Sequence, residues 1–384
     1  MKKIRDVTVY TVGDSSDIRT WSNVPYFFTE TLKKKGIQVN RVNLAPPAPV
    51  VFVGRVLWKF IGLFYRNRSY TELRSLPYFL LARWKIRKAL RQYPAAEADI
   101  FITFSFSSVG MSQRPIIQFC DWTFDYQVRH FERREPDRLE QGCIRREDAQ
   151  IEGSNLVVSL FPGVAKYMQG RYRNENILYL GNVVNASLQA NAEQSIALKV
   201  GSQSIVFIGK EKYQAGAQAL IAAFRMMRAQ FPALSVDIIG MKASDFAEIP
   251  EGVRCHGVLD KGNAAEGDLF YSILSRARMF VNTTPNWGGF SASLEAMYFY
   301  TPVVVTPYGE FLETFGPEIN FGRYCSDASV ETLCAQIESI LVHPSYDALC
   351  LRAHEAVRDF TWDAYTDKFL EAIVSRGLLE RRDS

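Results

Sequence analysis

The chain has 384 residues, of which 47% are apolar, and a formal net charge of +4 at neutral pH. A single hydrophobic core rarely keeps growing at this length, so we expect two domains, and the apolar content excludes a largely disordered chain. The small positive charge does not by itself indicate a nucleic-acid partner, and no apolar run reaches the ~18 residues that a membrane span needs.

Cysteine and histidine are few and lack the spacing of a metal site. The four histidines form no ligand cluster, and no CxxC pair occurs among the six cysteines: Cys120, Cys143, Cys255, Cys325, Cys334 and Cys350. We therefore expect no metal centre, and reduced thiols in a cytosolic protein. The opening residues MKKIRDVTVYTVGD lack the apolar core of a signal peptide, which also predicts a cytoplasmic protein, soluble or peripheral to a membrane.

The first 44 residues predict the opening of a doubly wound α/β domain. A β-branched run at 7–12 predicts a buried strand, Pro25 begins a helix that ends before Gly36, and 37–44 predict a second strand. Ligands in such folds lie beyond the carboxyl ends of the strands. The loop after the first strand, which contains Ser15 and Ser16, is therefore expected to face the ligand.

The segment 45–98 has the most unusual composition in the chain. Between residues 51 and 91 it carries ten Lys or Arg against one acid, Glu72, with aromatic residues interleaved. Such a stretch suits an anionic membrane surface, where each cation adds ~1 kcal/mol, and it also suits single-stranded nucleic acid. A pair of amphipathic helices with a solvated basic face is the structural alternative. We rank the membrane surface and the solvated face equally, and both ahead of nucleic acid.

The rest of the first half repeats strands and helices. Apolar runs at 99–104 and 115–119 predict two strands, and Asp121 follows the second of them. This places Asp121 as a candidate acid/base or acceptor-binding group, although an aspartate after a strand is often a cap or turn residue. Further strands and helices are predicted up to residue 180, and the polar stretch 186–202 is predicted to be a linker.

The second half opens with a predicted buried strand at 204–208, which ends in Gly209-Lys210-Glu211-Lys212. Lysines at the carboxyl end of a strand can hold a diphosphate as point charges. Lysines that simply face solvent are the alternative interpretation.

A second segment that suggests ligand binding is 284–306. It predicts a loop, a short helix and a buried strand. Gly288 and Gly289 form a turn before a helix that Ser291 or Ser293 can cap, and such a turn aims backbone N–H groups at a phosphate. Glu295 lies about one turn inside the helix. A carboxylate is unfavourable beside phosphate, so we expect Glu295 to accept hydrogen bonds from sugar hydroxyls, with a solvated glutamate as the alternative.

The stretch 284–306 resembles the nucleotide-sugar loop of GT-B glycosyltransferases, specifically the large retaining group similar to glycosyltransferase family 4. That group has a pattern of Glu, seven residues, Glu. Glu295 stands at the second Glu, followed by Ala296-Met297 and Thr301-Pro302-Val303-Val304 as in the family. Trp287 stands at the first Glu and is a departure at the position that contacts the donor sugar.

The resemblance extends over about residues 7–370, is strongest over 204–305 and is absent over 45–98. It implies an α/β protein of two Rossmann-like domains, 1–185 and 203–360, which face each other across a cleft. It also implies that 361–384 form a C-terminal helix that returns to the first domain.

The same resemblance assigns roles to residues of the second domain. Glu295 would bind the ribose, and the backbone near Val258 would pack on the nucleobase. The diphosphate would be held by the following residues: Gly288, Gly289, Phe290, Ser291, Lys210 and Lys212. It implies no metal and no cofactor beyond the substrate, a nucleotide diphosphate sugar of UDP or GDP type.

We therefore predict a glycosyltransferase that moves a sugar to a glycan or lipid-linked glycan acceptor. The acceptor would lie in the first domain near Ser15, Ser16 and Asp121, and the basic segment suggests the inner face of the plasma membrane, as in surface polysaccharide or lipopolysaccharide assembly. Two alternatives remain: a nucleotide-sugar epimerase of the same fold, and a non-catalytic binding subunit. The second is favoured by two departures from the family, Trp287 and Ala215, the latter at a usual Lys position.

Overall fold

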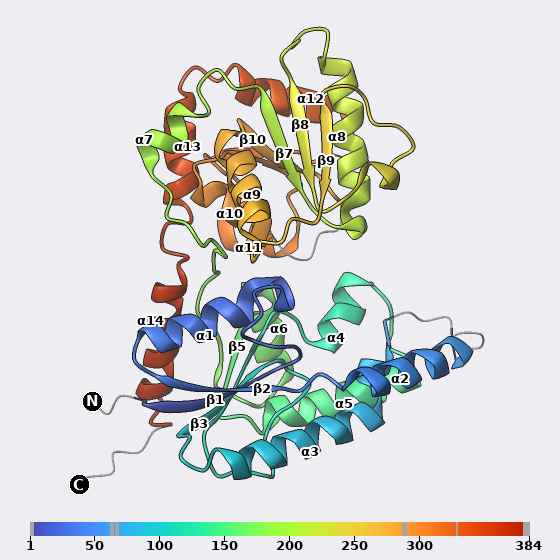
Figure 1. The fold of residues 1–384 in the computed structure, drawn as a ribbon, viewed down its shortest axis with the longest axis vertical. Helices are drawn as coiled ribbons and strands as arrows, with labels where there is room; N and C mark the ends of the chain where they lie inside the picture. The colour runs from blue at the N-terminus through green and yellow to red at the C-terminus, as the bar shows by residue number, and fades with distance from the viewer. Residues whose placement is uncertain (1–3, 62–64, 66–68, 286–289, 328, 379–384) are drawn as a thin grey trace. The chain divides into compact units, whose positions relative to one another are not determined.

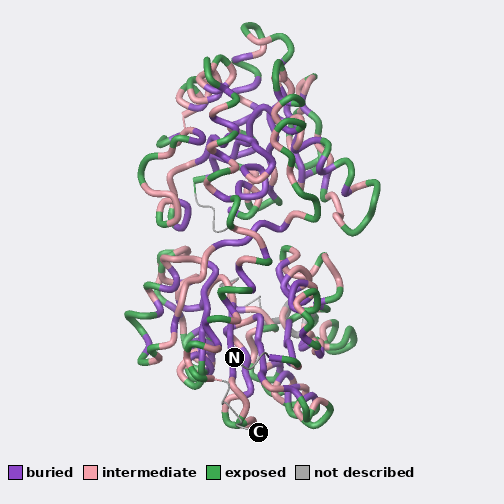
Figure 2. The backbone as a smooth tube through the Cα atoms, turned by 90° about the vertical axis from the view of Figure 1, so that its left-hand side faces the viewer, coloured by how far each residue is buried: buried purple, intermediate pink, exposed green. Residues whose placement is uncertain are grey.

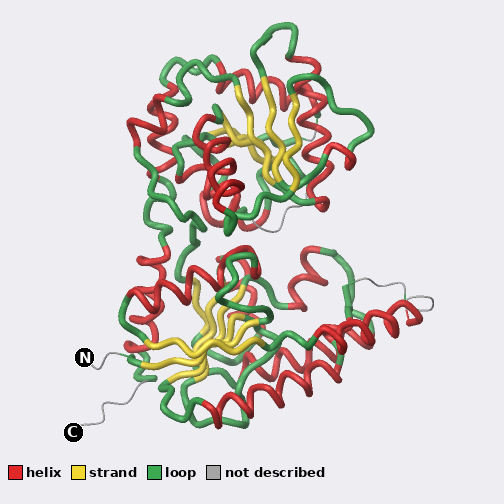
Figure 3. The backbone as a smooth tube through the Cα atoms, viewed as in Figure 1, coloured by secondary structure: helices red, strands yellow, loops and turns green. Residues whose placement is uncertain are grey.

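The computed structural model describes the following residues: 4–61, 65, 69–285, 290–327 and 329–378. The chain divides into two compact units, Met1–Asn182 together with Trp362–Ser384, and Val183–Thr361. Each unit contains one six-stranded sheet with helices packed on it (Figure 1, Figure 3). The prediction of two Rossmann-like domains is therefore confirmed.

The sheet of the first unit has the strand order β2-β1-β3-β4-β5-β6, and every pair of neighbours runs parallel. Its strands are β1 (Asp6–Thr11), β2 (Gln38–Asn43), β3 (Ala98–Ile102), β4 (Ile116–Cys120), β5 (Leu156–Ser159) and β6 (Ile177–Tyr179). Parallel strands need crossover connections, which the intervening helices supply. Helices then cover both faces, which explains why β3, β4 and β5 in the middle of the sheet are short, almost uninterrupted apolar runs, whereas the edge strand β2 is largely polar.

Within the described residues, the first unit contains seven α-helices. They are α1 (Val24–Lys34), α2 (Ala48–Ile61), α3 (Leu76–Gln92), α4 (Phe124–Tyr126), α5 (Arg138–Glu152), α6 (Pro162–Arg171) and α14 (Trp362–Ser375). On one face, Tyr78 and Ala82 of α3 pack into a cluster with Tyr10 and Phe101, whose rings stack 4.3 Å apart. The strands of each unit are correspondingly the most buried part of the backbone (Figure 2).

The helix α14 packs on the first unit, as predicted for the C-terminal helix. Phe369 of α14 lies 5.1 Å from Phe28 of α1 and 6.1 Å from Phe119 of β4, measured between ring centroids. An ion pair between Lys35 and Asp367, 2.8 Å apart, lies at the surface of the same contact. A segment from the far end of the chain thus completes the core of the first unit.

The sheet of the second unit has the order β12-β11-β10-β7-β8-β9 and is also parallel throughout. Its strands are β7 (Ser204–Ile208), β8 (Ser235–Ile239), β9 (Val253–Gly257), β10 (Met279–Asn282), β11 (Val303–Val305) and β12 (Gly322–Tyr324). Its helices are α7 (Ala192–Ala197), α8 (Gln214–Met227), α9 (Ala264–Arg276), α10 (Ser291–Tyr298), α11 (Gly309–Phe315), α12 (Val330–Leu341) and α13 (Tyr346–Glu355).

The core of the second unit lies between its sheet and the helices α8 and α12. Apolar side chains of both helices, such as Phe224 and Ile337, pack there against Val236 and Val304 of the strands. The polar stretch 186–202, predicted to be a linker, groups with this unit and contains α7.

The contact of α14 with the first unit can be tested by Phe369→Ala. Phe369 is fully buried among aromatic rings, so truncation leaves a cavity and should destabilise the first unit by about 3–5 kcal/mol. Urea unfolding of the full chain measures the change. Glu371→Ala, at an exposed position on the same helix, should lie within about 0.5 kcal/mol of the parent. Equal effects of the two substitutions would contradict this account of the packing.

Candidate functional site

Three loops of the second unit meet at the carboxyl ends of its strands. The loop after β7 contacts the end of β10, because the Thr284 hydroxyl donates to the carbonyl of Tyr213 at 3.4 Å. A Cβ atom added at Gly216, in the first turn of α8, would lie 2.4 Å from the Thr284 hydroxyl oxygen. The close approach of these loops therefore requires a glycine at this position.

Glu295 is the central polar group of this region. It lies on α10 with only 5% of its surface exposed, and both carboxylate oxygens accept from Lys261 Nζ, at 2.5 and 2.6 Å. Lys261 comes from the loop between β9 and α9. The structure thus joins a loop and a helix through two residues that lie 34 positions apart in the sequence.

Lys261 is itself enclosed. Its Nζ donates to the carbonyl of Asn185 at 3.2 Å, and the ammonium lies 4.4 Å from the ring centroid of Phe270. Only 10% of its side chain is exposed, against 6% for Glu295. A cation over an aromatic face is stabilised by the ring quadrupole, so Lys261 has a fixed position even without a ligand.

The charge state of Glu295 results from opposing effects. Burial raises the pKa of Glu295 above its ordinary value, because desolvation disfavours the charged form, while the Lys261 ammonium and a hydrogen bond from Tyr271 act to lower it. The pKa of Tyr271 is raised to about 12, first by burial and then by the Glu295 carboxylate. Tyr271 therefore stays protonated at neutral pH and is able to donate to Glu295.

The predicted phosphate turn is only partly covered by the described residues. Trp287, Gly288 and Gly289 lie outside them. Phe290 is the N-cap of α10 and is 3% exposed, whereas Ser291 is the exposed first residue of the helix. The prediction of a serine cap is wrong: no side chain caps α10, and the Ser293 hydroxyl instead donates to the carbonyl of Phe290 at 2.9 Å.

The other donor-side candidates lie at strand ends and face outward. Lys210 and Lys212 follow β7, and both are exposed; the Lys212 ammonium lies 4.8 Å from the ring centroid of Tyr213. Val258 directly follows β9 and is 65% exposed. The structure therefore places these residues at the same sheet edge as Glu295, but records no direct contact between them and Glu295 among the described residues.

In the first unit, the acceptor-side candidates also lie at strand ends. Ser15 is 1% exposed, and its hydroxyl has no hydrogen-bond partner among the described residues. Ser16 is exposed and bonds through its amide and hydroxyl to Asp14, at 2.8 and 2.7 Å. Asp121 accepts from the Trp122 amide at 2.7 Å, which is the geometry of a turn residue.

The loop after β1 contains strained backbone. Trp21, Ser22 and Asn23 have φ values of 35°, 55° and 70°, a left-handed conformation that side chains disfavour. The Asn23 side-chain amide donates to the carbonyl of Ile18 and so helps to hold this turn. Such strain concentrates at functional sites, which agrees with the position of the loop at the carboxyl edge of the sheet.

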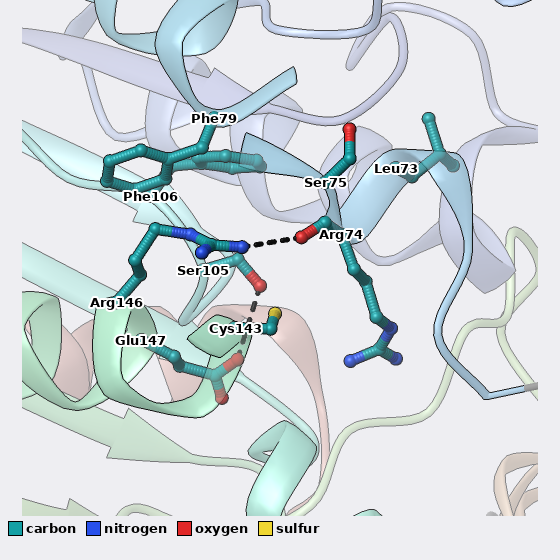
Figure 4. A pocket seen from close by; sticks show the side chains of 9 residues that line it. All are labelled: Leu73, Arg74, Ser75, Phe79, Ser105, Phe106, Cys143, Arg146 and Glu147. Carbon is teal, nitrogen blue, oxygen red and sulfur yellow. Dashed lines mark hydrogen bonds between the residues drawn. The ribbon is translucent and has the colours of Figure 1, made fainter. Parts of the chain in front are cut away.

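A small cavity lies next to the carboxyl end of β3 (Figure 4). Its volume of about 20 Å³ has room for one water molecule or one hydroxyl group. It is lined by Leu73, Arg74, Ser75, Phe79, Ser105, Phe106, Cys143, Arg146 and Glu147. Segment 45–98, which contributes four of these residues, therefore forms one wall of the cavity.

Glu147 is the buried acid of this cavity. One carboxylate oxygen accepts from the Phe124 amide at 2.8 Å, and the other accepts from the Ser105 hydroxyl at 3.3 Å. Arg146 donates to the carbonyl of Arg74 at 2.7 Å, which fixes a guanidinium at the opposite side of the cavity (Figure 4). Burial raises the pKa of Glu147 to about 7.

Exposed large apolar side chains occur on α2, on α3 and on the connection between them, and we call these residues the α2–α3 surface. They are Val50, Phe52, Val53, Val56, Leu73, Leu76, Leu80 and Trp84. Leu76, Leu80 and Trp84 are spaced by four residues and so lie on one face of α3. Lys88 continues that row, with its ammonium 5.9 Å from the Trp84 ring centroid.

No described helix is long and apolar enough to cross a membrane.

Residues 202–343 match the family model described as glycosyl transferases group 1, within the unit that contains Glu295 and Lys261. The second unit is a group 1 glycosyltransferase domain. The chain accordingly contains a glycosyltransferase domain of this group over residues 202–343. The resemblance inferred from the sequence is confirmed.

Solved structures with the GT-B fold match almost the whole glycosyltransferase chain, whereas no curated protein sequence matches it significantly. Sucrose-phosphate synthase from Thermosynechococcus elongatus has a TM-score of 0.67 and 17% identity, covering 97% of this chain and 99% of that one. Anabaena HepE, in complex with UDP and glucose, has a TM-score of 0.63 and 12% identity, covering 97% and 100%. WaaG, a glycosyltransferase involved in lipopolysaccharide biosynthesis, has a TM-score of 0.62 and 12% identity, covering 97% and 99%.

Lys261 is a residue of the candidate site that the sequence did not single out. It lies four residues after β9, in the stretch Val258-Leu259-Asp260-Lys261, and so carries the same signal that selected Lys210 and Lys212: a lysine that closely follows a predicted strand. Its partner is 34 residues away, and spacing alone does not reveal such a pairing.

The buried Glu147 predicts how the free energy of unfolding of the first unit depends on pH. Its folded pKa of about 7 lies above the ordinary 4.5, so the folded state favours the protonated form. The corresponding stability is fully present below pH 4.5 and is lost as the pH rises through about 7. Glu147→Gln does not titrate at this position and keeps an oxygen for the Phe124 amide. Relative to the parent, it should gain on the order of 1–3 kcal/mol between about pH 5 and pH 8.

Urea unfolding of both proteins at the two pH values measures this gain. Glu152→Gln, at an intermediate-exposure position on the same helix, serves as the control and should follow the parent. A parent and a Glu147→Gln variant with the same pH dependence would show that Glu147 is not held in its neutral form by burial.

Proposed function

We propose that this glycosyltransferase moves a sugar from a UDP-type donor to a glycan or lipid-linked glycan acceptor at an anionic membrane surface. Such a reaction would serve the assembly of a bacterial surface polysaccharide or lipopolysaccharide on the cytoplasmic side. The observation that carries the donor half of the proposal is the buried Glu295 carboxylate, held by Lys261 at the carboxyl edge of a group 1 domain.

In this proposal Glu295 accepts from the ribose hydroxyls of the donor. The first amides of α10, at Phe290 and Ser291, hold the diphosphate with Gly288 and Gly289, because a helix N-terminus favours negative charge. Lys210 and Lys212 add cations that stabilise the charge developing on the departing diphosphate. Val258 contacts the base. The complexes of HepE with UDP and with UDP-glucose support the choice of UDP.

The acceptor half of the proposal rests on the first unit. Ser15, Ser16 and Asp121 lie at the carboxyl ends of β1 and β4, where a parallel sheet binds its ligands. The buried Ser15 hydroxyl, which lacks a partner among the described residues, favours a ligand that supplies one. Asp121 would orient an acceptor hydroxyl.

The membrane half of the proposal rests on the α2–α3 surface. Leu80 and Trp84 are each 57% exposed, which is unusual for large apolar side chains unless they meet a partner or a lipid surface. Exposed Arg87, Lys88 and Arg91 follow them on the same helix, so apolar and cationic groups adjoin. This arrangement suits an anionic bilayer, into which the apolar groups insert while the cations pair with phosphates. The similarity to WaaG, a glycosyltransferase involved in lipopolysaccharide biosynthesis, supports an acceptor of this kind.

Donor binding can be tested by the melting temperature of the full chain with UDP, GDP, ADP and CMP. A ligand at 100 times its Kd should stabilise the folded state by about 2.7 kcal/mol. We expect UDP to raise the melting temperature of the parent and not that of Glu295→Ala. Each protein is compared with its own ligand-free state, because Glu295→Ala leaves Lys261 buried and unpaired and is less stable.

Equal stabilisation of the two proteins by UDP would contradict a role for Glu295 in the donor site. Turnover of UDP-sugar that requires a glycan acceptor would then separate a transferase from an epimerase and from a binding subunit. Release of an altered sugar nucleotide without acceptor would instead support the epimerase.

Membrane binding can be tested by flotation with phosphatidylglycerol-containing vesicles and with pure phosphatidylcholine vesicles. Changing Arg87, Lys88 and Arg91 together to Ser should weaken binding to anionic vesicles by about two orders of magnitude, since each cation contributes ~1 kcal/mol. Lys85 is left unchanged, because it donates to the carbonyls of Asn43 and Ala45 and supports the fold.

The matched control changes three exposed basic residues elsewhere in the first unit, Arg145, Lys166 and Arg173, to Ser. This triple variant carries the same net charge as the α3 variant and should bind vesicles like the parent. Equal loss in the two variants would indicate a nonspecific effect of charge and would contradict a membrane-binding role for the α2–α3 surface.

A further inference from the structure

We infer that Lys261 is a positioning residue of the donor site, which fixes the Glu295 carboxylate in place and keeps it charged, so that it can accept a hydrogen bond from the donor's ribose. This inference rests on the proposed role of Glu295. It concerns a residue that does not itself touch the substrate.

The hydrogen bonds of Lys261 account for all its donors. An ammonium has three N–H groups, and here two are directed to the Glu295 oxygens and one to the carbonyl of Asn185. None is left for a phosphate oxygen of a donor. Lys261 therefore differs from the exposed Lys210 and Lys212, for which no such bonds are recorded and which are available to a diphosphate.

The acceptor capacity of Glu295 is limited in the same way. A carboxylate has about four lone-pair positions. Lys261 occupies two of them, and Tyr271 provides a further hydrogen bond. The Tyr271 oxygen accepts from the Ser187 amide at 2.9 Å, so its own O–H is free to donate to Glu295. About one position remains, which suits a single ribose hydroxyl.

Burial makes the charge of Glu295 depend on Lys261. The ionisable groups that act on Glu295 are Lys261, on the loop before α9, and Tyr271, on α9. Tyr271 is neutral, so Lys261 is the cation that offsets the desolvation of the carboxylate. Without Lys261, the pKa of this carboxylate, which has 6% of its side chain exposed, would rise further, and a larger share of Glu295 would be protonated and would no longer be a charged acceptor.

The loop that carries Lys261 is preorganised. The Asp260 amide donates to Glu266 at 2.7 Å, and the Gly262 amide donates to Asp260 at 2.8 Å. A Cβ atom at Gly267 would lie 3.4 Å from the Lys261 carbonyl oxygen, so the loop packs closely on the first turn of α9. The backbone of Lys261 is thus fixed on both sides, as a residue that orients another group requires.

Calorimetric titration of the full chain with UDP, between about pH 6 and pH 9, tests the inference. The parent should bind with little pH dependence. Lys261→Met should bind about tenfold or more weakly at the low end of this pH range and should recover affinity as the pH rises, because deprotonation of Glu295 restores the charged acceptor. Glu295→Gln should be weaker at every pH, with a flat profile. Lys261→Arg keeps the cation and should retain the flat profile of the parent.

Two further variants of the chain serve as controls for this titration. If Lys261→Met does not fold, Lys261→Met combined with Glu295→Gln removes both charges and avoids an unpaired buried ion. The double variant should then bind UDP as Glu295→Gln does. Arg225→Met removes an exposed cation from the same unit and should leave affinity and pH profile unchanged.

Each outcome decides one question. A Lys261→Met variant with parental affinity and a flat pH profile would overturn the positioning role, and so would a double variant that binds as tightly as the parent. If Glu295→Gln binds UDP like the parent, or the parent binds no nucleotide, the proposed donor site itself fails. A lower melting temperature of Lys261→Met with unchanged UDP binding would reduce Lys261 to a purely structural residue.

Discussion

Parallel pairing of all neighbouring strands constrains both units of this glycosyltransferase. Because all strands of a sheet run in the same direction, they all end at the same edge. The loops after β7, β9 and β10 therefore lie at one edge although they are distant in sequence. Helices that follow these strands begin at the same edge and present their positive ends there. The contact between Lys261, in the loop before α9, and Glu295, on α10, is a consequence of this arrangement.

The charges of the second unit are divided between buried and exposed groups. Lys261 and Glu295 form a buried pair that is neutral as a whole, and all three donors of the Lys261 ammonium are bonded inside the protein. Lys210 and Lys212 remain in solvent, where an ammonium is well hydrated and can exchange water for phosphate at low cost. A buried pair orients a ligand and exposed cations attract it, so a site for a charged nucleotide benefits from both.

Helix α3 serves two surfaces of the first unit. Its inner face, with Tyr78 and Ala82, packs on the sheet and makes the crossover between β2 and β3. Its outer face carries the row that includes Leu80, Trp84 and Lys88. Because the inner face of α3 already covers the sheet, the apolar side chains on its outer face are not needed for the fold. Their exposure among the described residues is the observation on which the membrane proposal rests.

Much of the fold followed from local patterns in the sequence. Short β-branched runs ended by Gly or a polar turn predicted the central strands, since buried parallel strands leave little choice of residue. The stretch around Glu295 identified the family because a turn, a helix start and an acid must follow one another closely to hold a nucleotide sugar. The composition of 51–91 also indicated a basic, aromatic segment without reference to any structure.

Only the tertiary structure decided which distant groups meet. Lys261 reaches Glu295 from the loop before α9 and also donates to the carbonyl of Asn185, and the buried Glu147 of α5 accepts from Ser105 in the loop after β3. Lys85, one of ten similar cations in its segment, proved to be tied to backbone carbonyls. Sequence patterns report the period and composition of a segment, which determine its secondary structure and its exposed chemistry. Ion pairing and desolvation depend on distances between segments, and these are set by the packing of the sheets and helices.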